Sequence, residues 1–256
     1  MPIDQINTYE SAATQKMILV LGTSRGGTTL LSSSLGAHPD IAMLDEDMNG
    51  AICNITGGKI PANKLCVPNQ IDFEKKWNPI FALGLSNGFF RKTLFMNKIP
   101  KGIYNLQDYN KFGDMHFIGI LRHPAGVLSS IQKRENKSLD VACYRWQRCL
   151  EVFETLKNQD GFNFNILSFE SLVENPVGHL KELSDWLGVS YNPVMMEGPK
   201  SNKRYSYDKG FDPSKTDYQN SDDVWRYFSK DIQARYNRLL EFCIKPDAQQ
   251  TAVGHL

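Results

Sequence analysis

The stretch that decides the fold is Met17-Ile-Leu-Val-Leu21, followed by Gly22-Thr-Ser-Arg-Gly-Gly-Thr-Thr29. A short apolar run that ends at a glycine is typical of a strand buried on both faces of a parallel sheet. After the glycine-rich turn, Thr28 to Ala37 can form a helix, and Ile41 to Leu44 can form a second strand. The pattern predicts a β-loop-α-β unit over residues 17–48.

The glycine-rich turn has the glycines and the final hydroxyl residue of a Walker A phosphate loop, but Thr28 stands in the place of the lysine. Backbone N–H groups in such a turn, with the positive end of the following helix, favour a bound anion. The guanidinium of Arg25 suits a cluster of charged oxygens. The alternative is a tight β-to-α turn without a ligand. The combination favours a phosphate-binding loop.

A second buried strand, Phe117 to Leu121, runs into Arg122, Pro124 and a helix over residues 125–135 that carries Ser130. A phosphate-loop kinase would place an aspartate at the end of such a strand to hold Mg²⁺. An arginine there indicates a site that holds an anion directly. The alternative is a surface arginine beside a structural proline.

The rest of the chain alternates helices and strands. Helical periodicity is expected from Ala142 to Leu156, from Pro176 to Gly188 and from Val224 to Cys243, and strands are expected at 93–96 and 164–169. Residues 49–92 lack a sustained period and are interpreted as an acceptor-side insertion of loops and short helices. We therefore predict one α/β domain over residues 1–256 with a mostly parallel sheet flanked by helices.

Charge and composition exclude several classes of protein. The 29 Lys and Arg nearly balance the 28 Asp and Glu, which argues against a broad nucleic-acid-binding face. The start of the chain lacks the pattern of a signal peptide, and no apolar run is long enough for a membrane span, so a cytoplasmic protein is expected. Five cysteines without a Cys-x-x-Cys pair and scattered histidines predict no metal site.

The two anion motifs resemble those of sulfotransferases that use 3′-phosphoadenosine 5′-phosphosulfate (PAPS). Residues 22–31 resemble the 5′-phosphosulfate loop of that family, and Leu121-Arg-His-Pro-Ala-Gly-Val-Leu-Ser-Ser130, within the unit at 117–136, resembles its 3′-phosphate motif. Leu167 to Pro176 is similar to the family's Tyr-Glu-x-Leu segment, with Phe169 in place of the tyrosine. The protein-tyrosine, Golgi-type and bacterial branches are nearest in motif. The resemblance implies a sulfotransferase fold related to phosphate-loop NTPases.

The resemblance also implies which residues bind the cofactor. It assigns the 5′-phosphosulfate to Arg25, Gly26, Gly27, Thr28 and Thr29. It assigns the 3′-phosphate to Arg122 and Ser130, with Arg134 one helical turn later as a further cation. PAPS would be the co-substrate and 3′,5′-adenosine bisphosphate (PAP) the product, without a metal.

The catalytic residues implied by the resemblance are Glu46, Lys98 and Arg25. The segment from His38 to Asp47 matches the protein-tyrosine branch in spacing, which puts Glu46 at the position of the general base. The alternative for the carboxylates around Glu46 is a solvated acidic loop. Met96-Asn-Lys98-Ile-Pro100 resembles an Asn-Lys-x-Pro element whose lysine contacts the leaving group, so Lys98 would stabilise that charge.

The predicted function is therefore metal-independent, in-line transfer of a sulfuryl group from PAPS to an acceptor hydroxyl. The acceptor would be a small molecule or the hydroxyl of a glycan or peptide, and the sequence leaves the oligomeric state open. Two alternatives remain: a phosphate-loop kinase or NTPase, and a nucleotide-binding module without catalysis.

Overall fold

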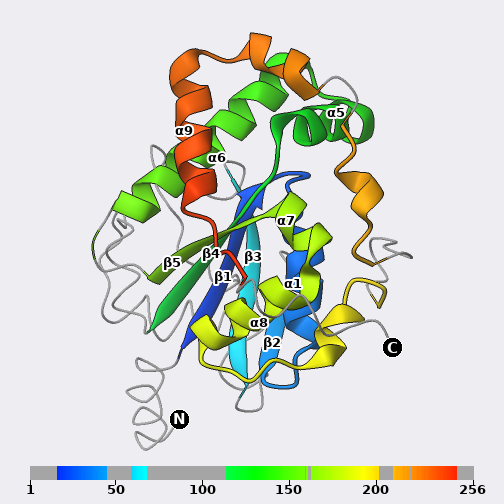
Figure 1. Ribbon diagram of the computed structural model, residues 1–256, viewed down its shortest axis with the longest axis vertical. Helices are drawn as coiled ribbons and strands as arrows, with labels where there is room; N and C mark the ends of the chain where they lie inside the picture. The colour runs from blue at the N-terminus through cyan, green and yellow to red at the C-terminus, as the bar shows by residue number, and fades with distance from the viewer. Residues whose placement is uncertain are drawn as a thin grey trace, which may run out of the picture.

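The computed structural model describes residues 16–44, 59–67, 114–158, 160, 163–201, 210–218 and 221–246. A five-stranded parallel sheet runs through the middle of the molecule in the order β2-β3-β1-β4-β5 (Figure 1). The strands are β1 (Met17–Thr23), β2 (Ile41–Leu44), β3 (Ile60–Val67), β4 (Met115–Leu121) and β5 (Asn163–Ser168). The predicted α/β class with a parallel sheet flanked by helices is confirmed.

Helices cover both faces of the sheet. One layer contains α5 (Pro124–Glu135), α6 (Leu139–Asn158) and α9 (Lys230–Glu241), and the other contains α1 (Thr28–Ala37), α7 (Phe169–Glu174) and α8 (Pro176–Leu187). Short 3₁₀ turns lie at η4 (Pro193–Met196), η5 (Pro213–Lys215) and η6 (Ser221–Tyr227). In Figure 1, α6 and α9 lie above the sheet in the view, α1 and α7 lie to its right, and α8 overlaps its lower part.

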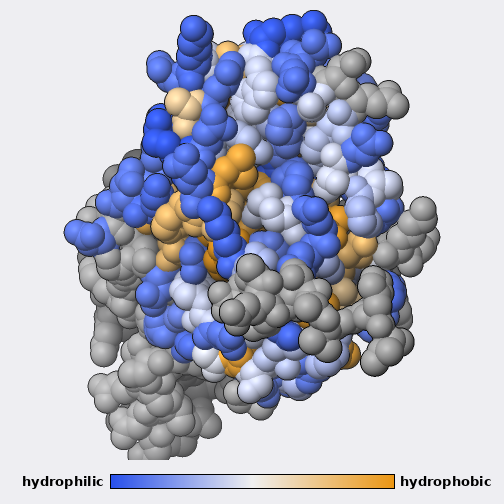
Figure 2. All heavy atoms as spheres, in the orientation of Figure 1, coloured by the Kyte–Doolittle hydropathy of each residue, from blue (hydrophilic) through white to orange (hydrophobic). Residues whose placement is uncertain are grey.

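The central strand β1 explains why there are two cores. Side chains alternate between the faces of a strand, so Leu19 and Leu21 join the cluster under α5 and α6, while Ile18 and Val20 join the cluster under α1 and α8. All four are at most 2% exposed. On the face shown in Figure 2, mostly hydrophilic side chains cover the helices, and hydrophobic atoms show in a band across the middle.

The strand β3 corrects part of the predicted insertion at 49–92. Ile60–Val67 pairs with β1 on one side and β2 on the other, so it is an interior strand of the sheet rather than a loop or short helix. Pro61, Asn63 and Lys64 interrupt its apolar pattern, which is why the pattern did not predict a strand. The remainder of the insertion and the expected strand at 93–96 lie outside the described residues.

The helix predicted from Val224 to Cys243 is divided into two elements, η6 and α9. Its apolar positions continue from Val224 to Cys243, but η6 ends at Tyr227 and α9 begins at Lys230. The hydroxyl of Ser229 accepts a hydrogen bond from the N–H of Ile232 and caps α9. A capping serine starts a new helix even where the apolar period continues.

Candidate functional site

The glycine-rich loop connects β1 to α1. Gly26 N–H donates to the carbonyl of Thr23 at 2.8 Å, and a Cβ on Gly26 would lie 2.8 Å from that oxygen. Gly27 has a φ of +104°, and a Cβ on it would lie 2.4 Å from the ring of Phe169. Among the residues that the structure describes, no side chain caps α1, whose N-terminal cap is Gly27. The first-turn N–H groups of α1 therefore remain available to an anion.

The two predicted anion motifs meet at Arg25. Its guanidinium Nε donates to the hydroxyl of Ser130 on α5 at 3.2 Å. Its backbone carbonyl accepts from Nη1 of Arg122 at 3.0 Å, across 97 positions of the chain. Arg25 itself has a φ of +65°, a conformation that is uncommon for a residue with a side chain. The structure therefore brings together Arg25, Ser130 and Arg122, three of the residues that the resemblance assigns to the cofactor.

Arg122 is held on several sides. Besides the carbonyl of Arg25, its guanidinium donates to the hydroxyl of Tyr218 and to the carbonyl of Lys215, each at 3.0 Å. Its central carbon lies 4.2 Å from the centre of the Phe169 ring, at a distance typical of a cation–π contact. These bonds engage three of its five N–H groups. The guanidinium is thus fixed in place beside the loop.

Glu170 and Tyr218 form the next layer of the site. The carboxylate of Glu170 accepts from the hydroxyl of Tyr218 at 2.7 Å and from the backbone N–H of His123 at 3.0 Å. Burial and the charge of Glu170 raise the pKa of Tyr218, so this phenol stays protonated and donates. Tyr218 was not predicted as a site residue. The signal for it in the sequence is that an aromatic residue stands in an otherwise polar segment.

Lys64 is a second residue that the sequence analysis missed. It lies on β3 beside β1, it is 3% exposed, and its ammonium donates to the hydroxyl of Thr29 at 2.9 Å. A lysine is rarely buried this deeply without a polar partner or ligand. Its ammonium therefore adds a positive charge at the end of the phosphate loop.

Glu135 is a third residue that the sequence did not single out. Its carboxylate accepts from the hydroxyl of Ser24 in the loop and from Arg145 at 2.6 Å. The preceding residue, Arg134, is exposed in the last turn of α5. The structure thus attaches α5 to the loop through Ser130 and Glu135, whereas the role of Arg134 stays a prediction.

The predicted base Glu46 and the predicted lysine Lys98 lie outside the described residues. The turn before β2 is described: the ring of His38 accepts from the N–H of Asp40 at 3.1 Å, and its other nitrogen lies 2.8 Å from the carbonyl of Ser190. These bonds fix the turn that leads into β2. Because β2 is parallel to β1 through β3, it ends at the edge of the sheet where the phosphate loop lies.

The described residues contain neither a metal-binding cluster nor a membrane-spanning helix. Among them, no three His, Cys, Asp or Glu side chains are grouped in a way that could hold a metal ion. None of the helices that the structure describes is long and apolar enough to cross a membrane.

The His123→Asn variant is expected to be less sensitive to acid than the wild type. The Nδ1 atom of His123 accepts from the N–H of Ala125, and burial lowers the pKa of the ring. The unfolded chain therefore binds a proton more readily, and this contribution to stability is present above pH 6.5 and lost as the pH falls below it. Asparagine keeps a capping acceptor but does not titrate.

Urea unfolding of both proteins at pH 7.5 and pH 5 checks this prediction. The loss of unfolding free energy between the two values should be smaller for the variant. An equal loss would show that His123 does not contribute to the acid sensitivity.

Comparison with solved structures identifies the fold. No family model matches the sequence, and no curated protein is significantly similar to it. The structure is similar to the sulfotransferase domain of the Synechococcus PCC 7002 olefin synthase, with a TM-score of 0.57, 14% identity, and 89% of this chain and 94% of that chain covered.

Two further structures are similar over most of their length. The sulfotransferase domain from the curacin biosynthetic pathway has a TM-score of 0.54 and 14% identity, with 91% of this chain and 99% of that chain covered. A sulfotransferase from Mycobacterium tuberculosis H37Rv has a TM-score of 0.50 and 13% identity, with 88% and 80% covered. The chain therefore has the sulfotransferase fold.

Proposed function

We propose that this protein is a sulfotransferase that uses PAPS and transfers its sulfuryl group to an acceptor hydroxyl. One observation carries the proposal: Arg122 and Ser130, from the predicted 3′-phosphate motif, both bond Arg25 in the predicted phosphosulfate loop. PAPS carries a phosphosulfate and a phosphate on one ribose, so a site for it needs two adjacent clusters of anion-binding groups. The sulfotransferase fold also supports the proposal.

The residues fit such a ligand. A Cβ at Gly26 would collide with Thr23 and one at Gly27 with Phe169, so the loop needs glycine at both positions, and the N–H groups of α1 follow them. Arg25 and Lys64 supply positive charge beside the loop, and Arg122 supplies it at the carbonyl of Arg25. Bound PAPS supplies the sulfuryl group that the acceptor receives. The protein contributes fixed donors for the charge that moves to the leaving phosphate.

Removal of the acceptor proton requires a base. We assign this role to Glu46, which follows the last residue of β2 by two positions in the sequence; β2 itself ends at the sheet edge from which the phosphate loop departs. A carboxylate there would accept the proton from the attacking hydroxyl. Lys64, and Lys98 by resemblance, are the candidates for the cation that stabilises the leaving group.

The test is a comparison of thermal unfolding with PAP and with ATP plus Mg²⁺. A ligand at about 100 times its Kd stabilises the folded state by about 2.7 kcal/mol. For a chain of this size that is a rise in Tm on the order of 5–10 °C. We expect this rise with PAP.

A rise with ATP and Mg²⁺ alone would favour a phosphate-loop kinase or NTPase and contradict the proposal. The absence of any rise with PAP would contradict it as well. If PAP binds, a Glu46→Gln variant that keeps PAP binding but loses transfer to an acceptor would separate the enzyme from a non-catalytic binding module.

A further inference from the structure

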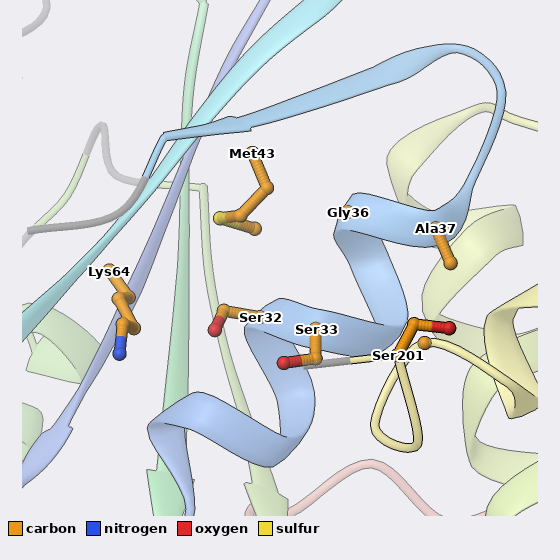
Figure 3. Close-up of a pocket in the computed structure, with 8 residues that line it drawn as sticks. Ser32, Ser33, Gly36, Ala37, Met43, Lys64 and Ser201 are labelled. Atoms are coloured by element: carbon orange, nitrogen blue, oxygen red, sulfur yellow. The ribbon is translucent and has the colours of Figure 1, made fainter. Parts of the chain in front are cut away.

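A cavity of about 290 Å³ lies beside the phosphate loop, between α1, β2, β3 and the turn after η4 (Figure 3). Its lining includes Ser32, Ser33, Gly36, Met43, Lys64 and Ser201. Figure 3 shows that the hydroxyls of Ser32 and Ser33 point to the side on which Lys64 lies. The ammonium of Lys64 is 2.9 Å from the hydroxyl of Thr29, so one wall of the cavity is in contact with the loop.

We propose that this cavity binds the acceptor, and that the acceptor is a small, uncharged aliphatic alcohol or polyol. The inference rests on the proposed function, because it takes the loop beside Lys64 as the place of sulfuryl transfer. An acceptor in the cavity would have its hydroxyl near that lysine, between the loop and the end of β2.

The volume of the cavity favours a small acceptor. It lies just below the ~300–1,000 Å³ found for ligand pockets. Two glycines of its lining are closely packed: a Cβ on Gly36 would lie 2.8 Å from Met43 Cβ, and a Cβ on Gly198 would lie 2.1 Å from the carbonyl of Ser33. The space suits a molecule the size of a sugar or a short alcohol and not a fused-ring compound.

The chemistry of the lining selects among small acceptors. Its polar side chains among the described residues are the hydroxyls of Ser32, Ser33 and Ser201 and the ammonium of Lys64. The hydroxyls of Ser32 and Ser201 donate to the carbonyls of Thr29 and Glu197, so their oxygens can accept from the hydroxyl of an alcohol. The described lining contains no aromatic ring on which a phenol could stack.

Charge narrows the class further. Lys64 is the one charged side chain among the described lining residues, so these residues offer no carboxylate to a cationic acceptor. An anionic acceptor would be held next to a loop that already binds an anion, and the like charges would repel. A neutral alcohol needs no carboxylate and is not repelled by an anion in the loop.

The experiment measures transfer of labelled sulfate from PAPS to a set of probes: glycerol, glucose, inositol, 4-nitrophenol and a hydroxysteroid. The variant is Ala37→Leu, which adds three carbons at a residue that lines the cavity. The matched control is Ala234→Leu, which adds the same bulk at an exposed position of α9. PAP binding is measured for all three proteins.

We expect transfer to at least one neutral polyol, and a rise in its KM of about tenfold or more in Ala37→Leu. The PAP affinity of both variants and the KM of Ala234→Leu should equal those of the wild type. Transfer to 4-nitrophenol or the steroid alone, or an unchanged KM in Ala37→Leu, would overturn the acceptor assignment while PAP binding left the proposed function intact. Failure of the wild type to bind PAP would overturn both the acceptor assignment and the proposed function.

Discussion

The Arg122→Ala variant is expected to weaken PAP binding by about 100-fold or more. Arg122 is half-buried, so we expect the lower part of the roughly 2–5 kcal/mol that truncation of a buried, hydrogen-bonded charge facing an opposite charge costs. Here the change would also release the carbonyl of Arg25 and the hydroxyl of Tyr218, both of which the guanidinium now holds at 3.0 Å. The 3′-phosphate would lose its main cation, and the loop would lose a restraint.

Isothermal titration with PAP measures the effect, with Tm in the absence of ligand as a test of folding. Arg238→Ala is the matched control, because it removes an arginine that bonds Glu154 on the outer face of α6 and α9. Its PAP affinity should equal that of the wild type. Arg122→Lys should bind weakly too, since lysine keeps the charge but not the planar fork that bonds Arg25 and lies on Phe169.

Wild-type affinity in a folded Arg122→Ala protein would show that the arginine only fastens the segment around Lys215 and Tyr218 to the sheet. The Tyr218→Phe variant separates the two roles further. It removes one partner of Arg122 without removing the cation. We expect it to bind PAP within about tenfold of the wild type because the cation stays in place, while the lost hydrogen bonds to the charged groups of Arg122 and Glu170, on the order of 1.5–3 kcal/mol each, lower the unfolding free energy.

Local sequence signals predicted the first unit of the fold closely. The expected helix at 28–37 and the expected strand at 41–44 have the observed bounds of α1 and β2, and the apolar run at 17–21 lies within β1. Each signal is contained in a few adjacent residues: an apolar run, a glycine turn and the return of the chain. Structural signals that are contained in a few neighbouring residues can be read from a sequence.

The strand β3 and its lysine could not be predicted in the same way. It is an interior strand because β1 pairs with one of its edges and β2 with the other. Its own residues include a proline, an asparagine and a lysine, which do not indicate a buried strand. The burial of Lys64 follows from that place. A lysine in a mixed segment is ordinarily exposed, so the segment alone does not reveal a site residue.

Tyr218 was missed for another reason. It is 96 positions from Arg122 and 48 from Glu170, and its contacts with both depend on how the segment at 210–218 crosses the end of the sheet. A motif predicts the residues within it. It does not predict which distant segment supplies their partners, and here that segment supplies the hydroxyl that connects Arg122 to Glu170.

The Lys64→Met variant is expected to lower kcat by about 100-fold or more while PAP affinity falls much less. Methionine is similar in length and removes only the charge and the donor. Loss of one fixed donor to the charge that develops in a transition state costs about 10²–10³ in kcat. The ammonium of Lys64 already lies 2.9 Å from the hydroxyl of Thr29, so it needs little movement to face that charge.

Single-turnover kinetics and PAP titration, carried out on the same protein, separate the two effects. Lys230→Met is the matched control, because Lys230 is exposed at the start of α9. Lys98→Met tests the rival, since the family resemblance gives Lys98 the leaving-group role. A loss of kcat in Lys98→Met with none in Lys64→Met would return the role to Lys98. A fall in PAP affinity equal to the fall in kcat/KM, with kcat unchanged, would mean that Lys64 binds the ground state and does not favour the transition state.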